Sequence, residues 1–212
     1  MDLSRVSLIR ESTQEQLRDI IYLEQLMCRL GFNDEIMHEQ PAIVHRHTGG
    51  LRIWQYPNQF AKYLRFLSDK NIQTYLEIGC RWGGTFVLTC EYLKPSQAFA
   101  VDIIDSPVSE YEGGTFLKMD SKSPEFREWM SSKIFDLVLI DGDHSYEGVL
   151  NDYSLVKDRA RIIVFHDIVN DACPGVVQLW NEIKHNYEHY EFTDQYADVK
   201  GKYLGIGVLF AA

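Results

Sequence analysis

Residues 75–84, YLEIGCRWGG, decide the expected fold of this chain. An apolar stretch here ends in the acid Glu77. Three glycines then precede a second apolar stretch, TFVLTCEYL: Gly79, Gly83 and Gly84. Glycine lets a backbone turn tightly and approach a ligand closely, and the start of a helix offers free N–H groups. The stretch therefore predicts a strand, a ligand-binding loop and a helix, in that order.

Strand and helix patterns alternate along the rest of the chain. Near-continuous Val, Ile, Leu and Phe is typical of strands that helices cover on both faces. It occurs in five runs: Thr74–Ile78, Ala98–Ile104, Thr115–Met119, Phe135–Ile140 and Arg161–Phe165. Two more runs close the chain, Tyr190–Thr193 and Tyr203–Phe210, with helix patterns between the earlier ones. This alternation predicts an α/β protein with a doubly wound, mostly parallel, seven-stranded Rossmann-like sheet.

The first 73 residues precede this pattern and are expected to form an N-terminal helical extension of the same domain. Apolar residues recur at helical spacing over residues 12–30 and 57–67. Residues 32–56 lie between them, are aperiodic and contain a Gly-Gly pair. We expect a long loop there, acting either as a lid or as a packing element. The chain thus divides into residues 1–73 and a ligand-binding part over residues 74–212.

Polar side chains follow each expected strand, at the edge where a doubly wound sheet binds its ligand. Asp102 ends the second strand and can accept hydrogen bonds from ribose hydroxyls. Asp120 follows the third strand, where an adenine amino group would need an acceptor. The loops after the fourth and fifth strands are rich in acids and histidines: Asp141, Asp143, His144, His166 and Asp167.

Taken together, these motifs resemble the class I S-adenosylmethionine-dependent methyltransferases. The shared elements are YLEIG with its Gly-Gly pair, the acid in AVD, the sequence IDGDHSYEGV and a strand that ends in FHD. More narrowly, the chain resembles the group whose fourth motif reads D-G-D-H-S-Y-E-G. The resemblance extends over residues 75–210, and the residues before it match only as a helical extension.

The resemblance implies that S-adenosylmethionine binds at the carboxyl edge of the sheet. The residues that would bind it share positions at the strand ends: Glu77, Gly79, Arg81, Gly83, Asp102, Asp120 and Asp141. Arg81 would pair with the carboxylate of the cofactor, with plain solvent exposure as the alternative. Asp141 would lie where the cofactor meets the methyl acceptor. The wide G-x-x-x-G-G loop suits this ligand, which lacks phosphates.

Some relatives in this class hold a divalent metal through acids after the fourth and fifth strands, and Asp141 and Asp167 match those positions. Catechol-type relatives have Asn directly after the second acid, whereas this chain has Ile168. His166 or Asp143 is then left as the third ligand. We therefore expect a metal site of Asp141, His166 and Asp167 for Mg²⁺, Mn²⁺ or another divalent cation. The alternative is a metal-free hydrogen-bonded network.

The expected reaction transfers a methyl group from the sulfonium to a hydroxyl oxygen of a small molecule or sugar, held in line with the S–CH₃ bond. The expected catalytic residues are Asp141, His144 and His166, with a histidine or a cation activating the hydroxyl. Two other classes stay open: a cofactor-binding regulatory domain without turnover, and a metal-dependent hydroxylase-like or hydrolytic enzyme. An NAD-dependent dehydrogenase is disfavoured by the glycine spacing.

The amino-acid composition limits which binding partners and which cellular location are expected for the protein. Thirty-one acidic and 21 basic residues give a formal net charge of −10, which repels a phosphate backbone and argues against nucleic acid. The four cysteines form no C-x-x-C pair and are interpreted as reduced. No apolar run suits a signal peptide or a membrane span. We expect a cytoplasmic enzyme with a small-molecule acceptor, away from membranes, and leave a homodimer open.

Overall fold

A computed structural model describes residues 1–35 and 40–211 of the chain. Within them, one seven-stranded sheet has the strand order β3-β2-β1-β4-β5-β7-β6. Its strands are β1 Thr74–Ile78, β2 Gln97–Asp102, β3 Thr115–Lys118, β4 Phe135–Ile140, β5 Ala160–His166, β6 Glu188–Phe192 and β7 Ile206–Phe210. Strands β1 to β5 run parallel, and β7 is antiparallel to both of its neighbours. The predicted fold class is confirmed.

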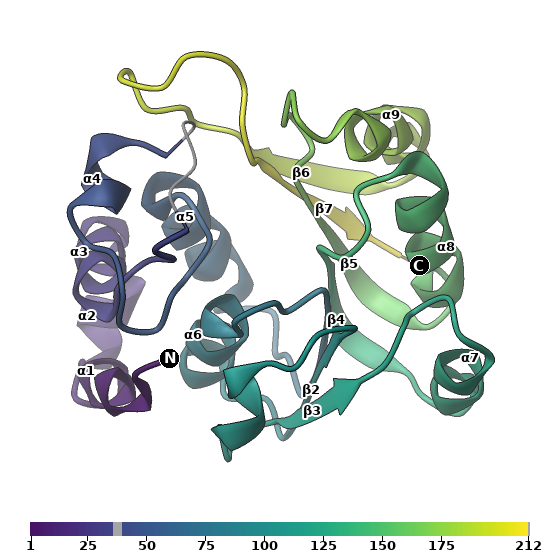
Figure 1. The fold of residues 1–212 in the computed structure, drawn as a ribbon, viewed down its shortest axis with the longest axis horizontal. Coiled ribbons are helices and arrows are strands. Elements are labelled where there is room, and N and C mark those ends of the chain that lie inside the picture. The colour runs from purple at the N-terminus through teal and green to yellow at the C-terminus, as the bar shows by residue number, and fades with distance from the viewer. Residues whose placement is uncertain (36–39, 212) are drawn as a thin grey trace.

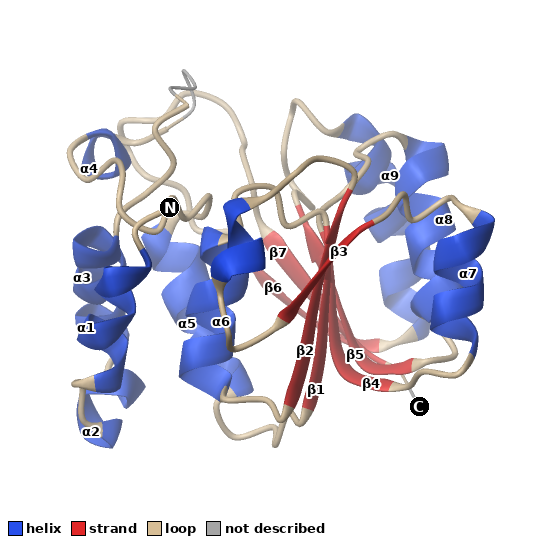
Figure 2. Cartoon of the chain, turned by 60° about the horizontal axis from the view of Figure 1, so that its bottom comes forward, coloured by secondary structure: helices blue, strands red, loops and turns tan. Residues whose placement is uncertain are grey.

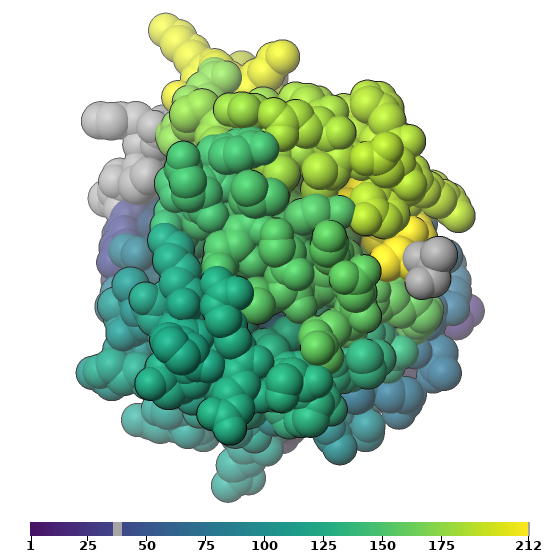
Figure 3. All heavy atoms as spheres, turned by 90° about the vertical axis from the view of Figure 1, so that its right-hand side faces the viewer, coloured from purple at the N-terminus to yellow at the C-terminus, as the bar shows by residue number. Residues whose placement is uncertain are grey.

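Helices cover both faces of the sheet (Figures 1 and 2). One face carries α5 Pro57–Leu67 and α6 Gly84–Leu93. The other carries α7 Pro124–Ser131, α8 Tyr146–Val156 and α9 Pro174–Ile183, and Figure 3 looks onto these three. Successive strand side chains point to opposite faces, so Tyr75 joins the core under α5 and α6 while Leu76 joins the other core.

Short helices at the N-terminus form a further layer outside α5 and α6 (Figure 2). They are η1 Leu3–Val6, α1 Ser7–Arg10, α2 Gln14–Arg18, α3 Ile20–Leu30 and α4 Ala42–His45; η2 Pro107–Glu110 and η3 Lys184–Asn186 lie further along the chain. The single helix predicted over residues 12–30 is wrong, because Asp19 leaves the helical conformation with a ψ of 117°. Its carboxylate instead caps α3 by accepting a hydrogen bond from the Tyr22 N–H at 3.1 Å.

The described residues between α3 and α5, 31–35 and 40–56, pack against the rest of the domain. Phe32 forms isolated bridges with Thr48 and Ile53, and its side chain is fully buried. Leu51 and Ile53 are buried as well. Residues 36–39, part of the predicted loop, lie outside the described residues. Motion of this segment as a lid stays a prediction, but its last residues are part of the hydrophobic core.

None of the helices in the described part of the chain is both long enough and apolar enough to cross a membrane.

Candidate functional site

The site lies where β1 and β4 end side by side. Strand order reverses between these two strands, and ligands of open α/β sheets bind at such a point. The loops that follow them come very close: a Cβ on Gly79 would lie 2.2 Å from the carbonyl oxygen of Asp141. Gly79 also has a φ of 88°, so only glycine fits without strain.

A cavity of about 720 Å³ opens beside this contact. Every residue predicted for the site lines it: Glu77, Gly79, Arg81, Gly83, Asp102, Asp120, Asp141, His144, His166 and Asp167. Its far wall comes from the N-terminal part, including Trp54, Gln55 and Tyr56. The loops after β1, β2, β3, β4 and β5 thus meet in one place, as their positions after the strands predict.

Acidic side chains shape the loops at the end of the cavity that carries the glycine loop of residues 79–84. Asp102 accepts hydrogen bonds from the backbone N–H of Arg81 at 2.6 Å and of Ile104 at 3.1 Å. Asp120 accepts one from the Lys122 N–H at 2.8 Å. Gly83 is the N-cap of α6 with a φ of 82°, and the N-terminal end of this helix lines the cavity. The carboxylates therefore fix the loop geometry and also border the cavity.

Arg81 has a partner within the chain. Its guanidinium lies 2.5 Å from a carboxylate oxygen of Glu35 and 4.8 Å from the ring centroid of Trp54. About half of the side chain is exposed (48%). A cofactor carboxylate would therefore have to share Arg81 with Glu35 or displace it.

Glu77 is a buried carboxyl group at the end of β1. Burial raises its pKa from 4.5 to about 8; the hydrogen bond donated by the Tyr75 hydroxyl opposes this rise, and the negative charge of Asp141 adds to it. Since the folded pKa lies above the unfolded one, the folded protein loses stability as the pH rises from 4.5 to 8.

Glu77→Gln should therefore stabilise the cofactor-free protein at high pH. Gln keeps an acceptor for Tyr75 but carries no charge, so we expect a gain of about 2–4 kcal/mol at pH 8 that vanishes near pH 4.5. Urea unfolding across this range measures it, with Glu128→Gln on the exposed face of α7 as the control. If the unfolding free energy of Glu77→Gln varies with pH as that of the wild type does, the raised pKa does not belong to Glu77.

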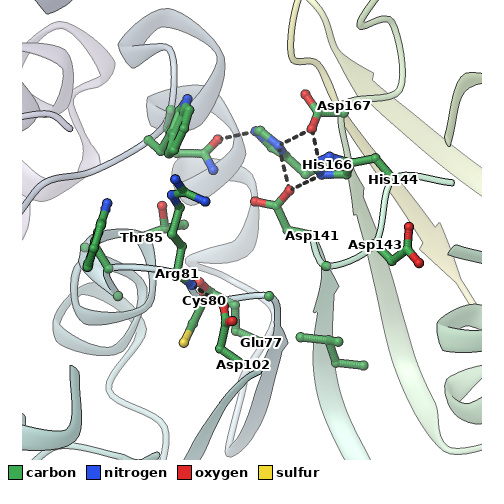
Figure 4. Close-up of a pocket in the computed structure, with 18 of the residues that line it drawn as sticks. Glu77, Cys80, Arg81, Thr85, Asp102, Asp141, Asp143, His144, His166 and Asp167 are labelled. Carbon is green, nitrogen blue, oxygen red and sulfur yellow. Dashed lines mark hydrogen bonds and ion pairs between the residues drawn. The ribbon is translucent and has the colours of Figure 1, made fainter. Parts of the chain in front are cut away.

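Two carboxylates and two imidazoles form a ring at the end of the cavity away from the glycine loop (Figure 4). Asp141 Oδ1 lies 3.1 Å from His166 Nδ1 and 3.3 Å from His144 Nε2. Asp167 Oδ2 lies 3.3 Å and 3.2 Å from the same two nitrogens. Asp143 points away from the ring and pairs with Lys122, so it does not supply the third ligand.

Backbone geometry explains how two adjacent residues reach this ring. In an extended strand, His166 and Asp167 would point to opposite faces. Asp167 has a φ of 66°, and this left-handed turn brings its carboxylate back beside His166. Asn170 holds it there by donating a hydrogen bond from Nδ2 to Asp167 Oδ1 at 2.6 Å.

The charges of the ring are strongly coupled. The hydrogen bond to Asp141 and the contact with Cys173 raise the pKa of His144 to about 11. Burial lowers the pKa of His166, but the charges of Asp141 and Asp167 outweigh it and raise the pKa overall. Burial opposes ionisation of Asp167, yet the His166 charge holds its pKa low. The two carboxylates therefore favour the protonated form of both imidazoles, and in that form an imidazole cannot accept a proton.

The ring fits a divalent cation. His166 Nδ1 is buried and makes no hydrogen bond, although two carboxylate oxygens lie close to it. Ligand atoms about 2.1 Å from one ion lie about 3.0–3.4 Å from one another, which matches these separations. One atom from each of Asp141, His166 and Asp167 lies within 4.8 Å of the others. A cation between them would take the place of the imidazole proton at His166 Nδ1 and balance the charge of both carboxylates.

Sequence reasoning missed three residues at this end of the cavity: Gln55, Asn170 and Cys173. Cys173 forms a second group with His144 and Asp167, whose ligand atoms also lie within 4.8 Å of one another. Asn170 had a local signal, because it follows the second acid, Asp167, by only three residues. Gln55 had no signal in the sequence, because its partner His166 lies 111 residues further along the chain.

Residues 76–168 match a family model described as a methyltransferase domain. The seven-stranded mixed sheet with its flanking helices is the Rossmann-like methyltransferase fold, and its strand β7 is antiparallel to both neighbours. No curated protein matches the sequence of the chain.

Solved structures agree with this fold. An O-methyltransferase from Bacillus cereus in complex with S-adenosylhomocysteine has a TM-score of 0.57 and 13% identity, over 98% of this chain and 96% of that one. MycE from the mycinamycin pathway, with Mg and S-adenosylhomocysteine, has a TM-score of 0.52 and 17% identity, over 77% and 50%. The N-methyltransferase NodS from Bradyrhizobium japonicum has 0.51 and 14%, over 71% and 93%. At these identities the likeness shows the fold alone.

Proposed function

We propose that this protein is an S-adenosylmethionine-dependent methyltransferase that methylates a hydroxyl oxygen of a small molecule or sugar, with a divalent cation held at the site. The observation that carries this proposal is a single cavity with two unlike ends. One end is the glycine loop with Asp102 and Asp120, and the other is the ring of Asp141, His144, His166 and Asp167. The methyltransferase-domain match over residues 76–168 supports the cofactor.

Within this proposal, Asp102 and Asp120 bind the nucleoside, and Gly79 lets the cofactor approach the backbone where β1 meets β4. Asp141, His166 and Asp167 would hold the cation, which supplies stabilisation of negative charge on the acceptor oxygen when bound. His144 has 42% of its side chain exposed, against 4% for His166, so it borders the acceptor and takes its proton once the carboxylates are neutralised.

The charges around the cavity support an uncharged acceptor. Each Arg or Lys among the described lining residues pairs with an acid: Arg52 with Asp34, Arg81 with Glu35 and Lys122 with Asp143. A phosphate ligand would need free cationic groups. The pairing therefore disfavours nucleic acid and NAD, in keeping with the net charge of −10.

The four cysteines are free, which supports the proposed cytoplasmic location.

Calorimetry with S-adenosylmethionine, S-adenosylhomocysteine and NAD tests the cofactor. We expect both adenosyl compounds to bind and NAD not to. Asp102→Ala should weaken their binding by about 1–3 kcal/mol, because charge-assisted hydrogen bonds to ribose are lost and the loop around Arg81 loosens. Asp105→Ala is the control, since its side chain is 88% exposed and pairs with Lys118. Binding of NAD, with no binding of either adenosyl compound, would contradict the proposed cofactor.

Turnover is tested separately, by release of S-adenosylhomocysteine with a panel of hydroxyl compounds, with added Mg²⁺ or Mn²⁺ and with a chelator. Cation-dependent release supports the proposal. Cofactor binding without release from any acceptor favours the regulatory alternative.

A further inference from the structure

Gln55, in the N-terminal part of the chain, forms a hydrogen bond with the histidine–carboxylate ring. Its Oε1 lies 2.8 Å from His166 Nε2, and both side chains are buried, at 3% and 4% exposure. Gln55 lies outside residues 76–168, which match the methyltransferase-domain model. A residue of the helical extension therefore contacts the ring directly.

The backbone leading to Gln55 is fixed at several points. The Leu51 N–H donates to the Leu30 carbonyl at 2.9 Å, and the Ile53 N–H donates to the Gly31 carbonyl at 3.0 Å. A Cβ on Gly84 would lie 2.2 Å from the Leu51 carbonyl oxygen, so this segment presses directly on the start of α6. Residues 51–55 thus form a well-anchored segment that runs from the predicted cofactor loop to the ring. We call this segment the strut.

A carbonyl oxygen can only accept, so the hydrogen bond places a proton on His166 Nε2. The other ring nitrogen, Nδ1, then faces Asp141 and Asp167. In neutral His166 this nitrogen carries a lone pair, which two carboxylates would repel but a cation would attract. Histidines that bind metals usually donate their second N–H to an oxygen in this way.

We infer that Gln55 is a positioning residue for the cation: it fixes the Nε2–H tautomer of His166 and aims Nδ1 at the ion between Asp141 and Asp167. This inference rests on the cation site proposed above. It makes the strut of residues 51–55 part of the cation site, so that the helical extension contributes to function as well as to packing.

Calorimetry with Zn²⁺ and with Mn²⁺ tests the inference on the full-length protein. Gln55→Met keeps the side-chain bulk but cannot accept from Nε2–H, so we expect cation affinity to fall about 10–100-fold. Gln55→Glu keeps an acceptor oxygen and should restore most of it. Gln59→Met is the matched control: Gln59 is equally buried, but it bonds the backbone of Asp194 and Gly205 and should change only thermal stability.

A second readout uses the unmodified protein. Long-range proton–nitrogen NMR of the zinc-loaded wild type should show His166 protonated on Nε2 with Nδ1 bound to the ion. An Nδ1–H tautomer overturns the inference even if Gln55→Met fails to fold. It is also overturned if Gln55→Met binds the cations as wild type does, or if Gln55→Glu is as weak as Gln55→Met.

The two proposals can fail separately. A wild-type protein that binds neither Zn²⁺ nor Mn²⁺ overturns the cation site and this inference together. Cation binding that depends on Gln55, without methyl transfer to any acceptor, overturns the proposed activity and leaves the inference standing.

Discussion

Replacing Asp167 by Asn is expected to weaken divalent-cation binding by about 100-fold or more, since loss of an outer-shell partner alone costs 10–100-fold. Asp167 is buried, at 4% exposure, and belongs to both groups of ligand atoms, one with Asp141 and His166 and one with His144 and Cys173. Asn is neutral and presents one oxygen in place of two. Cation-dependent methyl transfer should disappear with the cation.

Asp167→Asn should also destabilise the cation-free protein. The carboxylate compensates His166 and His144 in a buried setting, and removing one partner of such a group costs about 3–5 kcal/mol. Calorimetry and thermal unfolding with and without Mn²⁺ measure both effects. The control is Asp171→Asn, an exposed residue of the same loop that accepts a hydrogen bond from the Lys202 N–H. If wild type shows no cation-dependent stabilisation and no affinity to lose, the cation hypothesis should be dropped.

The sheet could be predicted because its signals are local. The runs Thr74–Ile78 and Phe135–Ile140 match β1 and β4 residue for residue, since buried parallel strands need unbroken apolar sequence. The run Ala98–Ile104 was predicted too long, because β2 ends at Asp102. Ile103 and Ile104 are 66% and 38% exposed and line the cavity, so their apolar character reflects the site rather than the sheet.

The positions of the polar residues directly after the strands likewise predicted where these residues meet. Asp141 and Asp167 follow β4 and β5, which pair directly, so their convergence follows from topology. The details of the ring did not, because they depend on the left-handed turn at Asp167 and on contacts between distant segments. The contact of Gln55 with His166 depends on how α3, the strut and the start of α6 pack against one another. A periodicity argument carries no information on such a contact.

The second large effect is expected for Gly79→Ala. The added Cβ would lie 2.2 Å from the Asp141 carbonyl oxygen and 2.4 Å from its carbonyl carbon, and the φ of 88° is unfavourable for alanine. Left-handed strain and the forced separation of the two loops together should cost about 2–5 kcal/mol of unfolding free energy. The Gly79 loop should move off Asp141, and we expect S-adenosylhomocysteine affinity to fall by a factor of about 10 or more, since 1.4 kcal/mol of lost binding already gives tenfold.

Gly49→Ala is the control that separates the cost of left-handed backbone strain from the cost of a steric clash at the added Cβ. Gly49 has a φ of 92°, close to that of Gly79, but nothing lies within 4 Å of the position a Cβ would take. It should therefore cost only the left-handed strain, about 1–2 kcal/mol, and leave cofactor affinity unchanged. Urea unfolding and calorimetry on both variants give the comparison. Equal losses of stability in the two variants, with cofactor binding intact in Gly79→Ala, would show that the β1 and β4 loops can part without harm. The proposed cofactor site would then not depend on the close approach of Gly79 to Asp141.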